Sequence, residues 1–239
     1  MQHRVRNTVI YVLVAALAFV GTAAAATLLD INGTIKDGEV KIIPQKGQKE
    51  PKLIDPNAGK PIELLVMGQD TRDGADNASI GGGDTSEGSH QADTTMVVQI
   101  SADRSYINLV SIPRDSLVDA PSCETSKGTI SAQYNVMFNS IFANGYTTGD
   151  DLASAASCTV NAVNSLTGLN IQNFIVVDFN GLKDMINAIG DVKICIPSDV
   201  KDPYTGLALT KGLHQLDGLA ATQYARTRYS LGDGSDVQR

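Results

Sequence analysis

Apolar residues along this 239-residue chain fall into short continuous runs that alternate with helix-type patterns. Aliphatic runs of roughly four to eight residues bounded by Gly, Asp or Ser are typical of buried strands, whereas apolar residues spaced about 3.6 apart predict amphipathic helices. The runs predict strands at residues 62–67, 94–100, 106–112, 174–179 and 192–196. The helix-type patterns predict helices at residues 132–143, 150–166, 182–189 and 218–228. Strands interleaved with helices predict an α/β or α+β sandwich, in which helices flank a central mixed β-sheet.

The N-terminal apolar stretch has the length of a membrane span. No charged residue lies between Arg6 and Asp30. At about 1.5 Å per residue, a transmembrane helix over residues 8–29 would cover a hydrocarbon core of roughly 30 Å. Basic residues within 1–7 favour a cytoplasmic tail, so we expect a single-pass protein of the cell membrane with an extracytoplasmic domain. The alternative is a cleaved signal peptide, because the alanines at 23–26 offer small-residue cleavage sites.

Two polar stretches follow the apolar one. Residues 30–60 mix Lys, Gly, Pro and Gln without periodicity, which predicts an extracytoplasmic linker and places the folded domain at residues 61–239. Residues 73–91 are polar and glycine-rich. A stretch of that length inside a domain is either a binding loop or a tolerated surface insertion, and the sequence leaves both readings open.

The three cysteines would lie in a compartment where disulfides persist. Cys195 falls within a strand-like run and is expected to be a small buried hydrophobe. Cys123 lies in a polar loop and Cys158 on a predicted helix, so these two are the preferred disulfide pair. The chain has no CxxC motif and no Cys/His cluster that would hold zinc.

The formal net charge of −7 argues against a nucleic-acid partner, because such proteins usually carry a basic surface. The three histidines, His3, His90 and His214, are isolated in sequence and are expected to be surface or loop residues. The charge therefore argues against nucleic-acid binding, and the isolated histidines do not indicate a catalytic site.

Charged residues instead gather at the predicted ends of strands. Asp70 and Arg72 follow the first strand and Gly68, where the chain can turn and the next side chains can project from the sheet. Asp93 opens a strand, and Arg114 closes the strand after it. If these two strands form a hairpin, Asp93 and Arg114 come within reach of one another. Each motif alone has a structural alternative: a turn-forming aspartate at Asp70, and a salt bridge between Asp93 and Arg114.

The last predicted helix carries Arg226 and Arg228 at its end. Arginines two apart share a helix face only where the helix is ending, so both can approach one anion from the terminal turn. Asp236 and Arg239 follow and could add charge or orientation. Guanidinium forks match phosphate oxygens bidentately and carboxylates bind hard cations, so the combined set predicts a site for a diphosphate with a metal ion.

Several ordered motifs in this set resemble the LytR-CpsA-Psr family of bacterial cell-envelope proteins, over about residues 61–239. The matching stretches are Gly68 to Arg72, Ala92 to Met96, Ser111 to Asp115, Leu166 to Leu169, Asp178 to Gly181, Ile189 to Val192, and Leu216 to Arg228. The resemblance implies a membrane-anchored enzyme that transfers a glycopolymer from a polyprenyl diphosphate carrier to a peptidoglycan acceptor, assisted by Mg²⁺.

The resemblance also implies roles for individual residues. Asp70 and Asp93 would bind the metal ion. The diphosphate would be bound by five arginines, namely Arg72, Arg114, Arg226, Arg228 and Arg239. Of these residues, Arg114, Arg226, Arg228 and Asp93 would be the catalytic ones. The lipid tail would lie in an apolar groove of the α/β core.

The chain departs from the family pattern at two places. Many relatives have an arginine where this chain has Gln91, so one diphosphate contact is weaker or comes from Arg72. The family also continues beyond Arg239 with an Arg-Gln pair and a helix, so the chain is expected to be a fragment. Two other functions remain open: a non-catalytic or regulatory module that binds envelope polymers or prenyl lipids, and a diphosphate hydrolase in which water replaces the sugar hydroxyl.

Overall fold

The computed structural model describes residues 38–48, 55, 58–72, 77, 80 and 90–227. The chain divides into two units, residues 1–41 and 42–239. The predicted cytoplasmic tail 1–7 and membrane span 8–29 lie outside the described residues. Within the described part of the chain, no helix combines the length and the apolar character that crossing a membrane requires. The fold below is that of the second unit.

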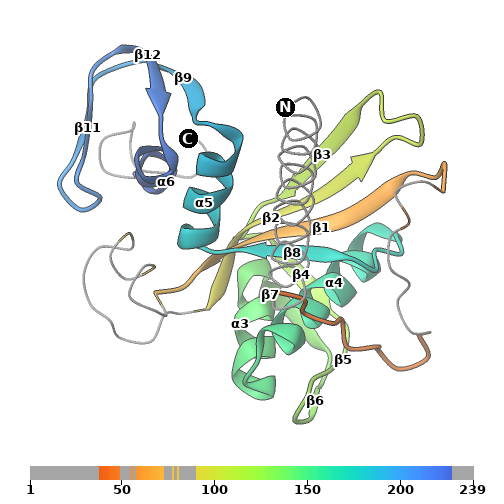
Figure 1. Ribbon diagram of the computed structural model, residues 1–239. Helices are drawn as coiled ribbons and strands as arrows, with labels where there is room; N and C mark the ends of the chain where they lie inside the picture. Colours follow the sequence, from red (N-terminus) through yellow and green to blue (C-terminus); the bar gives the residue numbers. More distant parts are fainter. Residues whose placement is uncertain are drawn as a thin grey trace, which may run out of the picture. The chain divides into compact units, whose positions relative to one another are not determined.

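The second unit is built on a mixed four-stranded sheet (Figure 1). Its strands are β1 (Ile62–Asp70), β2 (Gln91–Ile100), β3 (Ile107–Ile112) and β8 (Phe174–Val177), in the order β3-β2-β1-β8. β1 and β2 are antiparallel, as are β2 and β3, whereas β8 runs parallel to β1. The predicted mixed sheet is confirmed, and the two strands considered as a hairpin, β2 and β3, do pair.

One face of the sheet packs against α3 (Phe138–Gly149) and α4 (Leu152–Thr167). Leu65 and Met67 of β1 are completely buried in this core, together with Phe142 and Val163 of the helices. Because side chains alternate along a strand, Val66 of β1 projects to the other face, which Gly68 also lines. That other face carries the cavity described below.

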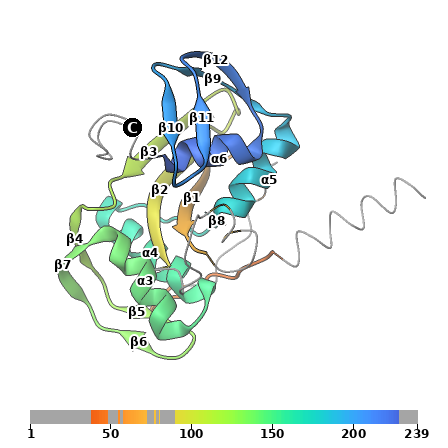
Figure 2. The same cartoon turned by 90° about the vertical axis from the view of Figure 1, so that its left-hand side faces the viewer.

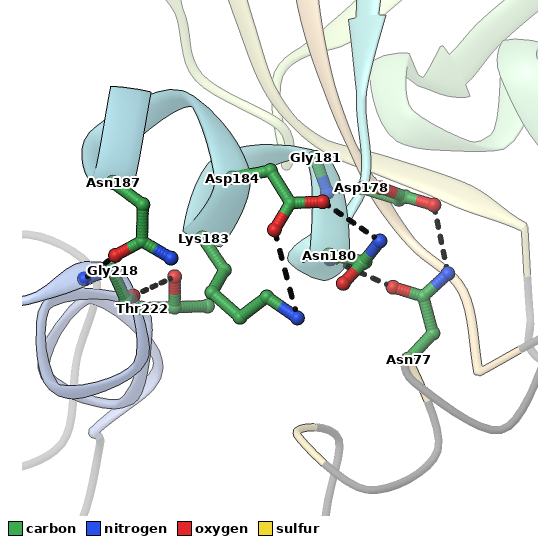
Figure 3. A network of polar contacts seen from close by, with 9 residues as sticks. All are labelled: Asn77, Asp178, Asn180, Gly181, Lys183, Asp184, Asn187, Gly218 and Thr222. Atoms are coloured by element: carbon green, nitrogen blue, oxygen red, sulfur yellow. Dashed lines mark hydrogen bonds and ion pairs between the residues drawn. The ribbon is translucent and has the colours of Figure 1, made fainter. Parts of the chain in front are cut away.

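The second helix pair is α5 (Phe179–Ile189) and α6 (Gly218–Arg226) (Figures 1 and 3). The two helices approach closely at Gly218, whose N–H donates to Asn187 Oδ1 at 2.8 Å. A Cβ at Gly218 would collide with the carbonyl oxygen of Lys183, so only glycine fits there. Asp217 caps α6 by accepting the Ala220 N–H at 2.8 Å. The Leu-Asp-Gly motif thus docks α6 on α5.

Short strands complete the unit. β9 (Val192–Ile196) pairs with β12 (Gly212–Leu216), and β10 (Val200–Asp202) pairs with β11 (Leu207–Leu209). They form a second, smaller core around Ile196, Val200 and Leu207, and Figure 2 shows them beside α6. Beyond α3 and α4, β4 (Leu117–Ala120) pairs with β7 (Gln133–Met137), and β5 (Cys123–Glu124) pairs with β6 (Thr129–Ile130).

Two sequence predictions about this region are wrong. The helix predicted over 132–143 begins only at Phe138, because residues 133–137 instead pair with β4. Cys195 is exposed rather than buried. In the two-stranded β9–β12 ribbon only alternate side chains, including Ile196, face the small core, and Cys195 lies on the opposite face.

The folded unit also begins earlier than Pro61. Ile42 packs against the main core, and the Ile43 N–H donates to Ser157 Oγ at 2.8 Å. Gln45 is buried, and its amide both donates to and accepts from the Glu124 backbone. These residues fall in the stretch whose composition predicted a linker. A few hydrogen bonds and one apolar contact can order a short segment that has no periodicity of its own.

Cys123 of β5 and Cys158 of α4 form a disulfide, the pairing that the sequence favoured. Both cysteines are buried in the main core. The bond links the β5–β6 ribbon to the helix layer across 35 residues of sequence.

Candidate functional site

A cavity of about 1300 Å³ lies on the sheet face opposite α3 and α4. Its walls come from β1 and β2, the start of α5, the β10–β11 turn and the end of α6. The charged residues that line it include Asp70, Arg72, Asp93, Arg114 and Arg226. The fold therefore gathers at one cavity five candidate residues that are spread over 157 positions of sequence. Arg228, Asp236 and Arg239 lie outside the described residues.

A β-bulge directs Asp93 toward this cavity. Gly68 pairs with Thr94 but Gln69 pairs with Ala92, so Asp93 is an extra residue in β2. Strict alternation would place Asp93 on the same face as Thr95, which is buried on the core side. The bulge shifts the register, so that Ala92 enters the main core while Asp93 lines the cavity. Bulges of this kind commonly re-aim a side chain beside a functional site.

Arg114 lies next to Asp93, as the predicted hairpin required. Its Nη1 atom is 3.2 Å from Asp93 Oδ1, and its Nε atom is 3.6 Å from Asp115 Oδ2. The side chains of Arg114 and Asp93 are 23% and 25% exposed, so the pair is accessible from the cavity. The Arg114 carbonyl accepts the Asn139 N–H at 3.0 Å, which attaches this backbone to the first turn of α3. The salt bridge foreseen as the structural alternative is thus present, and it lies inside the cavity.

Arg226 ends α6 and also lines the cavity. The helix stops there, with Thr227 as its C-cap, which confirms that a terminal turn presents this arginine. Arg226 Nη1 donates to the Ile80 carbonyl at 2.7 Å. The guanidinium carbon lies 4.4 Å from the centroid of the Phe179 ring, within cation–π range. Arg226 is therefore held by two neighbours before any ligand binds.

Asp70 and Arg72 mark the end of β1. The strand runs three residues beyond its predicted end at Met67, and Asp70 pairs with Gln91 of β2. The side chain across the ladder from Asp70 is therefore a neutral amide, that of Gln91. Arg72, two residues further along the chain, also lines the cavity.

The donor set at the cavity is compatible with magnesium. Asp70 and Asp93 supply two carboxylates. In the described part of the chain no group of three or more His, Cys, Asp or Glu side chains is arranged to hold a metal ion. Mg²⁺ is usually held by one or two carboxylates together with substrate phosphates, not by a cage made only of protein. Asp70 and Asp93 fit that requirement.

Sequence reasoning assigned no role to three other residues that line the cavity, Asp178, Phe179 and Tyr204. Asp178 follows β8, which is parallel to β1, so the strand-end argument used for Asp70 applied equally to it. Tyr204 lies in the β10–β11 turn, and no strand had been predicted on either side of it.

His90 is a half-buried loop residue directly before β2. Its Nδ1 atom lies 2.9 Å from Gln69 Nε2, and its ring stacks on Tyr146 with centroids 3.7 Å apart. It therefore packs between β1 and α3 just before β2.

Comparison with known proteins identifies the family. The family model LytR_cpsA_psr matches residues 27–239. The chain belongs to the LytR-CpsA-Psr family. One relative is the probable cell wall biosynthesis protein LcpB of Corynebacterium glutamicum, which is 32% identical over 180 residues, covering 73% of this chain and 38% of LcpB.

Another relative is TagT of Bacillus subtilis, a polyisoprenyl-teichoic acid–peptidoglycan teichoic acid transferase. It is 25% identical over 220 residues, covering 89% of this chain and 60% of TagT. The structure of TagT with bound octaprenyl pyrophosphate superposes with a TM-score of 0.52 at 21% identity, covering 80% of this chain and 66% of that one. The mixed α+β fold is therefore the fold of known LytR-CpsA-Psr structures. This chain spans only part of the length of these relatives.

Proposed function

We propose that this chain transfers a glycopolymer from a polyprenyl diphosphate carrier to peptidoglycan and forms a phosphodiester link. The observation that carries the proposal is the meeting of Arg72, Arg114 and Arg226 with Asp70 and Asp93 at one cavity. The relatives support it: TagT is named as a teichoic acid transferase, and its structure contains octaprenyl pyrophosphate.

The three arginines of the cavity suit a diphosphate. Arginine forks bind phosphate oxygens bidentately, and the arginines approach from different walls, with Arg114 at the end of β3 and Arg226 at the end of α6. Arg228 and Arg239 are proposed to add further contacts. A bound Mg²⁺, held by Asp70 and Asp93, would neutralise charge on the diphosphate oxygens.

The apolar lining of the same cavity suits the carrier lipid. Val66, Met96, Ile112, Leu182 and Met185 contribute to its walls. We propose that the prenyl chain lies along these side chains while its diphosphate reaches the arginines. Apolar and charged linings that meet in one cavity match the two chemical halves of a prenyl diphosphate.

The proposed reaction is an in-line displacement at the phosphorus next to the transferred sugar. A muramic-acid hydroxyl forms the new O–P bond, the bridging P–O bond breaks, and polyprenyl phosphate leaves with the bonding electron pair. Arg114 and Arg226 would stabilise the negative charge that develops on the phosphoryl oxygens. The hydroxyl proton needs an acceptor, and we assign it to no residue, because a carboxylate bound to a metal ion is a poor base.

The site is proposed to work outside the cytoplasm, at the membrane. Residues 8–29 would form the single span with residues 1–7 in the cytoplasm. The Cys123–Cys158 disulfide supports this topology, because such bonds persist in oxidising compartments. The lipid carrier and the peptidoglycan acceptor would then both be within reach.

The test is a transfer assay with the full-length protein, a prenyl diphosphate-linked glycopolymer, peptidoglycan and Mg²⁺. We expect glycopolymer to become covalently attached to peptidoglycan with release of prenyl phosphate. Binding of the prenyl diphosphate without Mg²⁺-dependent release of any phosphate would instead indicate a binding or regulatory module. Phosphate release without attachment would indicate a hydrolase.

A further inference from the structure

Two residues from the segment between β1 and β2 are buried against the α5–α6 pair. Asn77 is 7% exposed and Ile80 is 4% exposed, although the surrounding sequence is polar and glycine-rich. Each of them forms a hydrogen bond to a residue about 100 or more positions away in sequence. Both bonds end at the wall of the cavity that contains Arg226.

Asn77 binds the N-terminus of α5 through both ends of its amide (Figure 3). Its Nδ2 atom donates to Asp178 Oδ2 at 2.7 Å, and its Oδ1 atom accepts the Asn180 N–H at 2.8 Å. Asp178 Oδ1 accepts the Gly181 N–H at 2.7 Å and is the N-cap of the helix. Asn77 therefore joins a helix end that Asp178 already caps, so its second bond is not needed to start the helix.

The backbone of Ile80, three residues after Asn77, contacts Arg226. The Ile80 carbonyl accepts from Arg226 Nη1 at 2.7 Å. Phe179, the residue between Asp178 and Asn180, supplies the ring that lies 4.4 Å from the Arg226 guanidinium carbon. Arg226 thus contacts the Ile80 carbonyl and the face of the Phe179 ring. Asn77, three residues before Ile80, forms hydrogen bonds to the residues on both sides of Phe179.

We propose that Asn77 is a positioning residue, which orients the Arg226 guanidinium toward the diphosphate by attaching the Ile80 backbone to the first turn of α5. The inference rests on the proposed function, in which Arg226 binds the diphosphate. An arginine side chain has many rotamers, so fixing the guanidinium before the substrate arrives removes an ordering cost from the reaction. The bond to Ile80 uses one of the five N–H donors of the guanidinium.

The experiment compares Asn77→Ala with a matched control, Asn180→Ala, in the full-length protein. Asn180 contributes only its backbone N–H to the Asn77 contact, and its side chain bonds Asp184 within the same helix at 3.2 Å. With a prenyl diphosphate-linked sugar as substrate, we expect Asn77→Ala to lower kcat about tenfold and leave KM within about twofold. Asn180→Ala should keep kcat within about twofold of the parent.

Arg226→Ala distinguishes positioning from a merely structural role. Substitutions of two residues that act through the same group have non-additive effects. Adding Asn77→Ala to Arg226→Ala should therefore lower kcat no further. An equal loss in both backgrounds, or no loss from Asn77→Ala, would overturn the inference while leaving the proposed function intact. Parental activity in Arg226→Ala itself would remove Arg226 from the proposed site and the inference with it.

A second variant covers the case in which Asn77→Ala does not fold. Phe179→Leu keeps an apolar side chain under the guanidinium but removes the π face. It should lower kcat several-fold in the parent and not in Arg226→Ala. An additive loss would contradict the positioning of Arg226 by its neighbours.

Discussion

Removal of the Cys123–Cys158 disulfide should destabilise the domain without altering its chemistry. The bond closes a loop of 35 residues, and the chain-entropy relation gives about 4 kcal/mol for a loop of this length at 25 °C. We propose the double variant Cys123→Ala/Cys158→Ala, because alanine places no hydroxyl in a buried site. Neither cysteine lines the cavity, so the folded protein should transfer glycopolymer at a rate within about twofold of the parent.

Urea unfolding followed by far-UV circular dichroism measures this loss. With a slope of about 2 kcal/mol per M, a loss of about 4 kcal/mol lowers the midpoint by about 2 M. Cys195→Ala is the matched control, because Cys195 is free and exposed, and its midpoint should stay within about 0.3 M of the parent. If the double variant unfolds at the urea concentration of the parent, or if the control loses as much, the disulfide does not stabilise the fold in the way argued.

Four further predictions address the site and its supports. Arg114→Ala should slow transfer about a hundredfold, yet change the free energy of unfolding by no more than about 1 kcal/mol, because its ion pair is partly exposed; parental kcat would refute the role. Asp93→Ala should abolish the response to added Mg²⁺ in the transfer assay, and an unchanged magnesium titration would rule this carboxylate out as a ligand. Gly218→Ala should cost about 1–3 kcal/mol in thermal unfolding, because the new Cβ collides with the Lys183 carbonyl; an unchanged Tm would show that α5 and α6 move apart freely. Asp151 caps α4, and although burial raises its pKa, hydrogen bonds from two serines outweigh this and lower the pKa. The contribution of the Asp151 carboxylate to stability should therefore be present above about pH 4 and be lost as the pH falls further. Asp151→Ala should lower the free energy of unfolding by about 1 kcal/mol at pH 7 and by much less near pH 2. Urea unfolding at both pH values measures the difference.

The parts of the fold that sequence predicted are those with strong local signals. The four strands of the central sheet contain continuous apolar runs, and α4 ends at Gly168, a glycine with positive φ. Buried aliphatic runs and glycine C-caps are both consequences of local chemistry, so they are visible without a structure.

The parts that sequence missed depend on pairing. β4 to β7 and β10 to β12 have two to five residues each, and each is stabilised by its partner strand more than by its own composition. Residues 133–137 look helical because they precede a true helix without a break. Strand pairing between segments distant in sequence leaves no local periodicity to detect.

The candidate site likewise has some contacts that sequence predicts and others that it does not. The contact between Asp93 and Arg114 could be predicted from the sequence, because a hairpin fixes which strand ends lie side by side. The bulge that turns Asp93 to the cavity, and the contact of Ile80 with Arg226, depend on tertiary register and could not be foreseen.

The most direct test of the account is a crystal structure of the folded domain with a prenyl diphosphate and Mg²⁺ bound. We expect diphosphate oxygens within hydrogen-bond distance of Arg72, Arg114 and Arg226, the metal ion at Asp70 and Asp93, and the prenyl chain along Val66, Met96 and Leu182. A diphosphate bound away from these arginines, with the cavity filled by other residues of the protein, would contradict the account.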